Sequence, residues 1–203
     1  MARTINPDEY DARYRALLEA AKACFARKGF HRTSTAEICA ELGVSSGSLF
    51  HYFPSKKAIV TAIVEQEGLE TAQHLDGLLA QEDLGAALRD FIDLILTLAG
   101  DAAFSRLALE IAAEAARDPD IGVLVAHNDA ELRRQLALLV GEAKARGQIA
   151  PASAPAAVAQ GIAALIDGIF SRVAMDPQFR PSKHRPVFQQ MLAGLLQPQG
   201  AQR

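Results

Sequence analysis

The sequence predicts an all-α protein of about nine helices. No stretch sustains the two-residue alternation of polar and apolar side chains that a half-buried strand needs, and the β-branched residues are scattered among the helix formers Ala, Leu, Glu and Arg. Half of the 203 residues are apolar, enough to build a folded core. Glycine, proline and aspartate then divide the chain into segments of helical length.

The first helix is predicted over residues 7–28, where apolar residues recur at spacings of three and four and Gly29 supplies a stop signal. Thr33 or Ser34 can cap a short second helix that runs to residue 42. Glu37 stands three residues after Ser34, as a capping box requires. Gly43 ends this helix.

The third helix is predicted to start at Ser45 or Ser46 and to end at Pro54, which cannot donate the next backbone hydrogen bond. Ser55 caps a long fourth helix that reaches about Leu79. Beyond it, breaks at Gly, Pro and Asp delimit five more helices, over residues 84–99, 103–116, 119–146, 154–174 and 186–196.

Charge is divided unevenly along the chain. Residues 1–57 contain nine Lys/Arg and six Asp/Glu, whereas the remainder contains twelve and eighteen. A positive N-terminal part and a negative remainder favour contact of the N-terminal part with a polyanion. Cys24 and Cys39 are too few for a disulfide scaffold and are expected to be reduced apolar residues. The alternative, a redox-sensing thiol, needs exposure and positive neighbours.

The sequence predicts a cytoplasmic protein without a membrane span. Charges such as Asp167 and Arg172 interrupt the apolar segments before they reach about 18 residues, and the first ten residues lack an apolar signal core. No cofactor or metal is expected. Glu70 and His74, four residues apart, could share a metal ion, but no second pair supports them.

The second and third helices have the lengths and the turn of a helix-turn-helix. Gly43 gives conformational freedom at the bend, and Val44 can bury the turn against Ile38 and Leu49. A generic helical hairpin would have similar features, so the spacing alone leaves both interpretations open.

Residues 29–59, GFHRTSTAEICAELGVSSGSLFHYFPSKKAI, resemble the DNA-binding region of the tetracycline-repressor (TetR) family. The matching elements are Gly29-Phe30, Thr33-Ser34, Ile38, Gly43-Val44-Ser45, Gly47-Ser48-Leu49, His51-Tyr52-Phe53 and Ser55-Lys56. The resemblance implies a helix-turn-helix domain over residues 1–54 and a ligand-binding and dimerisation domain over residues 55–203, connected by the helix from residue 55. It implies a homodimeric transcriptional regulator, a repressor that a small-molecule effector releases from a palindromic double-stranded DNA operator.

Two positions depart from the family pattern. Phe50 stands where the family usually has a tyrosine that contacts a DNA phosphate, so this contact is lost or replaced through Tyr52 or His51. Ser46 stands where a basic residue is frequent, which leaves base recognition at that position open.

Physical roles can be assigned to the residues of this region. Thr33, Ser34 and Lys56 lie at helix N-termini, where free N–H groups and the helix dipole favour a phosphate. Tyr52 is expected to contact phosphate or to cover the core edge, and Lys28 and Arg32 are further phosphate candidates. Base recognition then falls to the third helix. Its predicted contacts are Ser45, Ser46, Gly47, Ser48 and His51; the alternative is that the serines are only caps and surface residues.

A dimer surface is expected because one helix-turn-helix covers about one half-site. The last two helices carry broad apolar stripes with small residues between them. The predicted dimer residues are Gly161, Leu165, Gly168, Ile169, Phe188, Met191, Leu192 and Leu195. The alternative is that both stripes pack within one subunit. Residues 106–120 and 142–149 loosely resemble the betaine-regulator (BetI) branch of the family.

An effector pocket is expected among the fourth to eighth helices, with apolar walls and a few polar groups. Asn128 and Gln135 interrupt an apolar stripe, and Phe91, Phe104 and His127 are further candidates, with His74 and Asp93 beside them. Each has the alternative of being an ordinary surface or core residue.

Two other functions compete with this interpretation. A family member without a small-molecule effector could act as a nucleoid or cell-division partner. A helical-bundle enzyme is the second alternative, but the Glu-x-x-His pairs of a di-iron bundle are absent, and no strand precedes Ser45-Ser46-Gly47-Ser48 as a Gly-x-Ser-x-Gly nucleophile motif requires.

Overall fold

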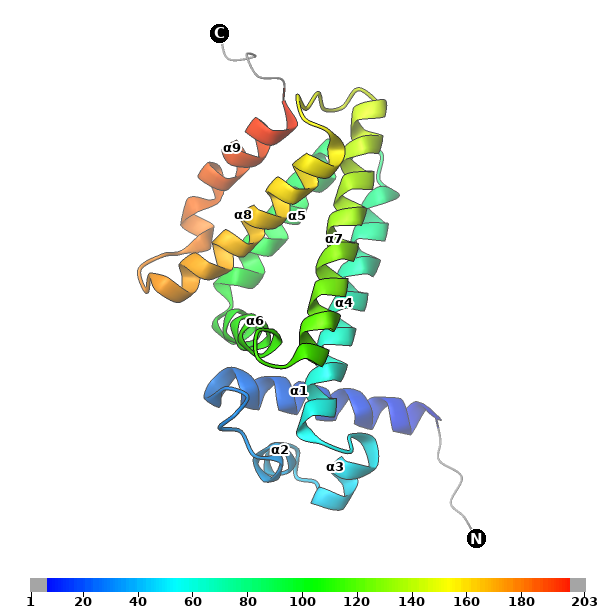
Figure 1. The fold of residues 1–203 in the computed structure, drawn as a ribbon, viewed down its shortest axis with the longest axis vertical. Helices are drawn as coiled ribbons and strands as arrows, with labels where there is room; N and C mark the ends of the chain where they lie inside the picture. The colour runs from blue at the N-terminus through cyan, green and yellow to red at the C-terminus, as the bar shows by residue number, and fades with distance from the viewer. Residues whose placement is uncertain (1–6, 198–203) are drawn as a thin grey trace. The chain divides into compact units, whose positions relative to one another are not determined.

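The computed structural model describes residues 7–197, and over this range the chain forms nine α-helices, one 3-10 helix and no strand (Figure 1). The predicted all-α class is therefore confirmed. The helices are α1 (Pro7–Lys28), α2 (Thr35–Leu42), α3 (Ser46–Tyr52), α4 (Lys56–Leu79), α5 (Leu84–Gly100), α6 (Ala102–Ala115), α7 (Pro119–Ala145), α8 (Pro155–Met175) and α9 (Arg185–Leu196). The 3-10 helix η1 (Pro181–His184) was not predicted, since a single turn between prolines has no periodicity to detect.

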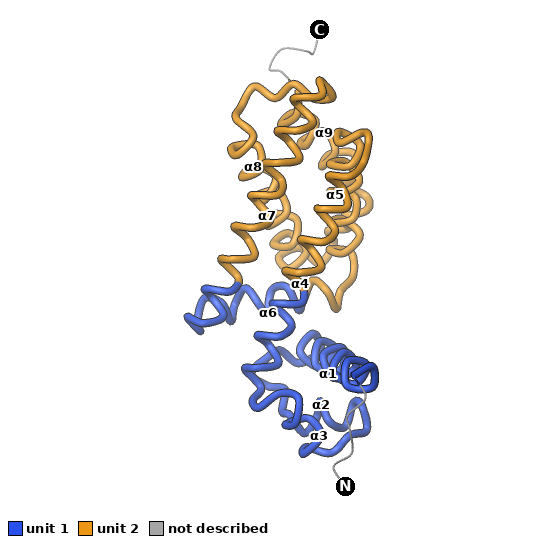
Figure 2. Tube along the Cα trace, turned by 90° about the vertical axis from the view of Figure 1, so that its right-hand side faces the viewer, with its two compact units in different colours: residues 1–66, 106–124 blue, residues 67–105, 125–203 orange. Residues whose placement is uncertain are grey.

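The chain divides into two compact units (Figure 2). Unit 1 comprises Met1–Gln66 and Arg106–Leu124, and unit 2 comprises Glu67–Ser105 and Val125–Arg203. Helix α4 is shared, since its first half lies in unit 1 and its second half in unit 2. Unit 1 therefore contains more than the N-terminal helices, because it includes most of α6 and the start of α7 as far as Leu124.

Unit 1 is built on side chains that are almost completely removed from water. Burial of such side chains stabilises the fold by about 1.5–3 kcal/mol each. They come from α1, α2, α3 and α4, and include Leu17, Leu18, Phe25, Ile38, Leu49, Ile59 and Ile63.

Local capping sets the ends of the two short helices. Ser34 caps α2, and its side chain and that of Glu37 form the predicted capping box. Gly43 ends α2 in the left-handed region, with φ 67° and ψ 36°, where a side chain would be strained. Ser45 caps α3 by accepting the Ser48 N–H at 3.2 Å. The turn between α2 and α3 is thus determined by the helix caps within residues 34–48.

Unit 2 is a bundle in which α5 is the most deeply buried helix. Asp83 caps α5 by accepting the Ala86 N–H at 2.7 Å. The core draws on α4, α5, α7, α8 and α9, with fully buried members that include Leu75, Leu84, Ile92, Leu136, Leu139, Ile162, Ile169 and Leu192.

Helix α8 is long and apolar enough to cross a membrane, judged by its length and composition alone. In this fold it contributes Val158, Ile162, Ile166 and Ile169 to the core of unit 2. Core helices of soluble proteins have the same composition, so α8 is explained by its packing.

Candidate nucleic-acid interface and ligand cavity

Helix α3 presents two different faces. Leu49 is completely buried in unit 1, whereas Ser46, Gly47, Phe50 and His51 are exposed. These four positions follow helical spacing and form one continuous face. Phe50 is unusual for an apolar side chain because 47% of it is exposed. The face therefore offers hydroxyl, aromatic and imidazole groups without a carboxylate.

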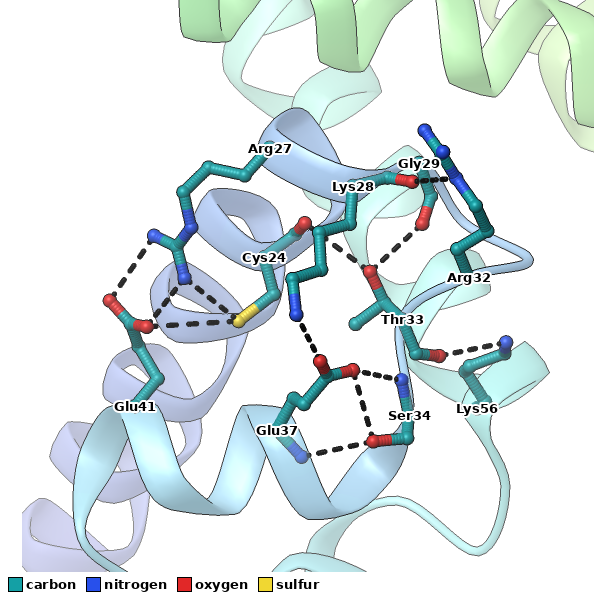
Figure 3. Close-up of polar contacts among 10 residues, drawn as sticks. All are labelled: Cys24, Arg27, Lys28, Gly29, Arg32, Thr33, Ser34, Glu37, Glu41 and Lys56. Atoms are coloured by element: carbon teal, nitrogen blue, oxygen red, sulfur yellow. Dashed lines mark hydrogen bonds and ion pairs between the residues drawn. The ribbon is translucent and has the colours of Figure 1, made fainter.

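The two hydroxyls before α2 have different environments (Figure 3). Ser34 is exposed, and its Oγ accepts the Glu37 N–H at 3.2 Å. Thr33 is only 1% exposed, and its Oγ1 donates to the Gly29 carbonyl at 2.8 Å. The Thr33 hydroxyl is thus turned into unit 1, where it closes the connection between α1 and α2.

Lys56, at the start of α4, also stabilises the connection between α1 and α2. Its Nζ donates to the carbonyls of Phe30 at 2.9 Å and Thr33 at 3.0 Å, and it lies 4.7 Å from the centre of the Phe30 ring. A third carbonyl, that of His31, is 3.4 Å away. The ammonium protons therefore point at backbone carbonyls, and Lys56 fixes residues 30–33 against α4.

The basic residues near α2 are partly neutralised. Arg27 pairs with Glu41 at 2.5 Å, and Lys28 pairs with Glu37. The bond from Lys28, together with bonds from the backbone and hydroxyl of Ser34, lowers the pKa of Glu37 to about 2. Arg32 is exposed and donates from its Nε to the Lys28 carbonyl at 2.9 Å.

Tyr52 is half-buried at the end of α3, where it packs on an aromatic partner that the sequence interpretation missed. The rings of Tyr10 and Tyr52 lie 4.6 Å apart, and the Tyr10 ring is 6.2 Å from that of His51. Tyr10 lies more than forty residues away in the chain, so no local pattern indicated this pairing.

Unit 1 also contains a set of carboxylates from α6 and the start of α7. Glu110 accepts the backbone N–H of Phe30 at 2.9 Å, and Glu114 lies 2.9 Å from Nε2 of His31. Asp118 and Asp120 both pair with Lys57, each at 2.7 Å. Hydrogen bonds from these two carboxylates raise the pKa of Lys57. These carboxylates thus bind the connection after α1 and the first turn of α4. No local sequence pattern indicates these contacts.

Unit 2 contains a cavity of about 400 Å³. The structure brings the predicted Phe91 and Phe104 to its wall, together with His74. Its lining is Glu67, Glu70, Thr71 and His74 of α4, Phe91, Leu94, Ile95 and Leu98 of α5, Phe104 of α6, Leu132 of α7, and Ile166 and Phe170 of α8.

Four of the pocket candidates are not among these lining residues, and one of them, Asp93, instead pairs with Arg185 of α9 at 2.5 Å. Gln135 is 2% exposed and donates from Nε2 to Oδ1 of Asp76 at 3.0 Å, which ties α7 to α4. His127 and Asn128 lie on α7 more than a turn before Leu132. The interruption of an apolar stripe at Gln135 thus corresponds to a buried hydrogen bond between helices.

The predicted dimer residues fall into two groups. Gly161 faces α9, because a side chain there would meet Leu195 at 3.3 Å, and Ile169 and Leu192 are completely buried within the chain. Leu165, Phe188 and Leu195 are partly buried against the same core. Gly168 and Met191 are exposed, and the Cβ position of Gly168 has open space around it.

No group of three or more His, Cys, Asp and Glu side chains that could hold a metal ion occurs among residues 7–197. The Glu70 and His74 side chains instead form part of the cavity wall.

Comparisons with known proteins agree over both parts of the chain. The model of the bacterial regulatory proteins of the tetR family matches residues 17–63, and that of the C-terminal part of BetI-type transcriptional repressors matches residues 84–197. The regulator UidR of Escherichia coli strain K12 is 26% identical over 183 residues, which cover 89% of this chain and 91% of UidR.

Two solved structures extend the similarity. Salmonella enterica GusR is 28% identical, with a TM-score of 0.74 over 91% of this chain and 95% of GusR. A transcriptional regulator from Saccharomonospora viridis, solved in complex with choline, has a TM-score of 0.79 over 92% of this chain and 98% of its own, at 22% identity.

A capped helix-turn-helix followed by a helical bundle with a cavity defines a DNA-binding transcriptional regulator. The chain belongs to the TetR family and has the C-terminal region of the BetI-type repressors.

Proposed function

We propose that the chain represses transcription as a homodimer that places the exposed face of α3 in the major groove of a palindromic operator. The observation that carries this proposal is the face formed by Ser46, Gly47, Phe50 and His51, backed by the buried Leu49. Small side chains let the helix backbone approach the base edges closely, and serine and histidine can hydrogen-bond to them.

Phosphate contacts in this proposal come from groups around α3. Ser45 and Ser48 lie at the N-terminal turn of α3, Ser34 lies at that of α2, and both turns present backbone N–H groups. Arg32 adds an exposed cation, and Tyr52 supplies a phenol. Thr33 and Lys56 act indirectly, because they fix the residues from which Arg32 and Ser34 project. Such contacts set position and affinity, and the α3 face sets sequence preference.

Dimerisation is assigned to the exposed faces of α8 and α9. These faces carry small and apolar residues, and Met175, Val187 and Met191 are each more than half exposed. Ala164, Gly168 and Gly194 leave room for close approach of a partner helix. Burying such a patch against a second copy removes it from water, as in stable homodimers.

The effector site is assigned to the cavity of unit 2. A volume of about 400 Å³ suits a small organic ligand, and a relative of the same fold binds choline. One wall belongs to α4, the helix whose first residue, Lys56, holds the connection between α1 and α2. A ligand that binds one position of α4 more tightly than another would shift the equilibrium between the two conformations. The resulting change in operator affinity is limited by the ratio of the ligand's affinities for these conformations. We assign the protein to the cytoplasm, where its operator lies.

The test is selection of duplexes from fragmented genomic DNA by the purified chain, followed by footprinting. We expect a protected region with two inverted half-sites, and loss of protection in the Ser46→Glu variant, since a carboxylate would face the DNA. Equal retention of all fragments by both proteins would contradict the proposal.

A further inference from the structure

Tyr10, near the start of α1, is joined to the last turn of α3 by ring contacts. Its ring centre lies 4.6 Å from that of Tyr52, with the ring planes tilted by 37°, and 6.2 Å from that of His51, edge to face at 79°. His51 and Tyr52 also contact each other edge to face, at 5.2 Å. The three rings, here called the ring cluster, thus connect α3 to the N-terminal half of α1, beside which it lies (Figure 1).

The ring cluster lies at the surface of unit 1, outside its core. Tyr10 and Tyr52 are partly buried, and His51 is exposed. One turn further along α1, Tyr14 contacts Phe53 at 4.8 Å between ring centres, and Phe53 is only 2% exposed. The contact between Tyr14 and Phe53 therefore attaches α1 to the end of α3 from within the core. The ring cluster is a second attachment, made by side chains that remain accessible to a ligand.

The ring cluster bears on DNA binding because it contains the phenol of α3. Phe50 has no hydroxyl, so Tyr52 carries the aromatic hydroxyl of this helix. A side chain that is already held in one rotamer loses less conformational entropy when it binds, and its contact is tighter for that reason. A ring contact at 4.6 Å lies in the favourable range for aromatic pairs, so Tyr10 restricts the movement of the Tyr52 ring.

Tyr10 itself is poorly placed for a phosphate contact. Its two neighbours in the chain, Glu9 and Asp11, are exposed carboxylates, which would repel a phosphate. Helix α3, in contrast, contains no carboxylate between Ser46 and Tyr52. The ring of Tyr10 is therefore the part that serves α3, and its hydroxyl is not needed for this role.

We propose that Tyr10 is a positioning residue for DNA binding, which holds the Tyr52 phenol in place for a phosphate before the operator binds. The inference rests on the proposed role of α3 at the operator, and it extends the DNA-binding apparatus to α1. Tyr10 acts through Tyr52, and His51 completes the ring cluster. The ring of Tyr10 is thus required, whereas its hydroxyl is dispensable.

Operator titrations with Tyr10→Phe and Tyr10→Ala separate the ring from the hydroxyl, with a duplex that the natural chain selects. Tyr10→Phe keeps the ring, so its affinity should stay within about twofold of that of the natural chain. Tyr10→Ala should bind about fivefold more weakly, because the Tyr52 side chain must then be ordered on binding. Equal losses in both variants would make the hydroxyl a direct contact and overturn the proposal. The control, Leu138→Ala, removes an apolar side chain of α7 that is 49% exposed and should leave operator affinity unchanged.

A double-mutant cycle with Tyr52→Ala tests whether Tyr10 acts through Tyr52. In a chain that already lacks the Tyr52 ring, Tyr10→Ala should change operator affinity by less than about twofold. An undiminished loss in this background would overturn the proposal, because Tyr10 would then affect DNA binding only by supporting the fold of unit 1.

The ring contact is measured without DNA, by nuclear magnetic resonance of the full-length chain with isotope-labelled tyrosine rings. The Tyr52 signal is identified by its absence from Tyr52→Phe. It should shift in Tyr10→Ala, which removes the ring current of Tyr10, and should stay close to its natural position in Tyr10→Phe. An unshifted Tyr52 signal in Tyr10→Ala would overturn the ring contact, and a shifted signal without loss of operator affinity would overturn its role in binding.

Failure of this inference and failure of the proposed function give different results. A natural chain that selects no duplex would contradict the proposed function and the role of Tyr10 together. Selection of a duplex that the natural chain and Tyr10→Ala bind equally well would contradict the role of Tyr10 alone.

Discussion

Thr33 and Ser34 are adjacent hydroxyl residues, yet one is directed into the core of unit 1 and the other into solvent. Lys56 complements the buried one, because it donates to the Thr33 carbonyl and to that of Phe30. The sequence predicted phosphate contacts for both Thr33 and Lys56, so their structural roles could not be deduced from their positions in the motif. The distinction between contacting DNA and positioning a contact residue can be measured.

Lys56→Ala and Arg32→Ala should differ in the salt dependence of DNA binding. Removal of a phosphate contact lowers the slope of log affinity against log salt by about 1, which we expect for Arg32→Ala. Lys56→Ala should weaken binding with little change of slope, and it should lower the free energy of unfolding by about 1–3 kcal/mol, because it removes charge-assisted hydrogen bonds. A reduced slope with unchanged stability in Lys56→Ala would instead make Lys56 a phosphate contact. Lys144→Ala, on the exposed side of α7, serves as the control.

Phe50→Ala should separate stability from recognition. The side chain is 47% exposed, so its removal should change the free energy of unfolding by no more than about 0.5–1 kcal/mol. On the α3 face, however, a phenyl ring can contact a thymine methyl group, so operator affinity should fall and base preference should relax. Leu69→Ala removes an apolar side chain that is 60% exposed in unit 2 and should leave operator affinity unchanged. Equal effects of the two substitutions on operator binding would contradict a role for Phe50 at the groove.

At the scale of elements, the parts predicted correctly are those with local causes. The capping box of Ser34 and Glu37, the left-handed Gly43 and the stop at Pro54 act over a few residues, so the bounds of α2 and α3 could be read from the chain. The hydrogen bond from the Phe30 N–H to the Glu110 carboxylate joins residues eighty positions apart, and no local pattern reveals such a bond. The cavity wall was predicted only in part for the same reason, since Gln135 interrupts an apolar stripe in order to reach Asp76.

The capping box of α2 should make the stability of the protein depend on pH in the acid range. Hydrogen bonds from Lys28 and Ser34 lower the pKa of Glu37 from 4.5 to about 2 in the folded state. The stabilisation is therefore complete above pH 4.5 and is lost as the pH falls from there towards 2. The difference in unfolding free energy between the natural chain and Glu37→Gln, measured by urea unfolding, should shrink across this range. A difference that does not change with pH would contradict the assignment.

For the whole molecule, the sequence predicted one apolar stripe on each of α8 and α9, but it could not divide the stripes between the core and a partner. Ile169 and Leu192 turned out to be core residues, whereas Gly168 and Met191 are exposed. The sequence could not distinguish these two possibilities, because helical periodicity identifies an apolar face without identifying whether the chain's own core or a second copy covers it.

Gly168→Arg should dissociate the proposed dimer without unfolding the subunit. The Cβ position of Gly168 meets no atom within 4 Å, so the chain itself has room for a side chain there. A charged side chain in a close helix–helix contact would prevent the second copy from approaching. Sedimentation velocity should show a dimer for the natural chain and a monomer for the variant, with unchanged helical circular dichroism. Ala126→Arg, at an exposed position of α7, is the matched control and should remain dimeric.

The most direct test of the central claim is selection of binding sites from a random duplex library by the natural chain and by a Ser46→Ala, His51→Ala variant. If the exposed face of α3 reads the bases of two half-sites, the natural chain should enrich an inverted repeat whose half-site centres are separated by whole helical turns. The variant should lose preference at the same positions in both halves. Failure to enrich any repeat, or an identical motif for the two proteins, would contradict the account.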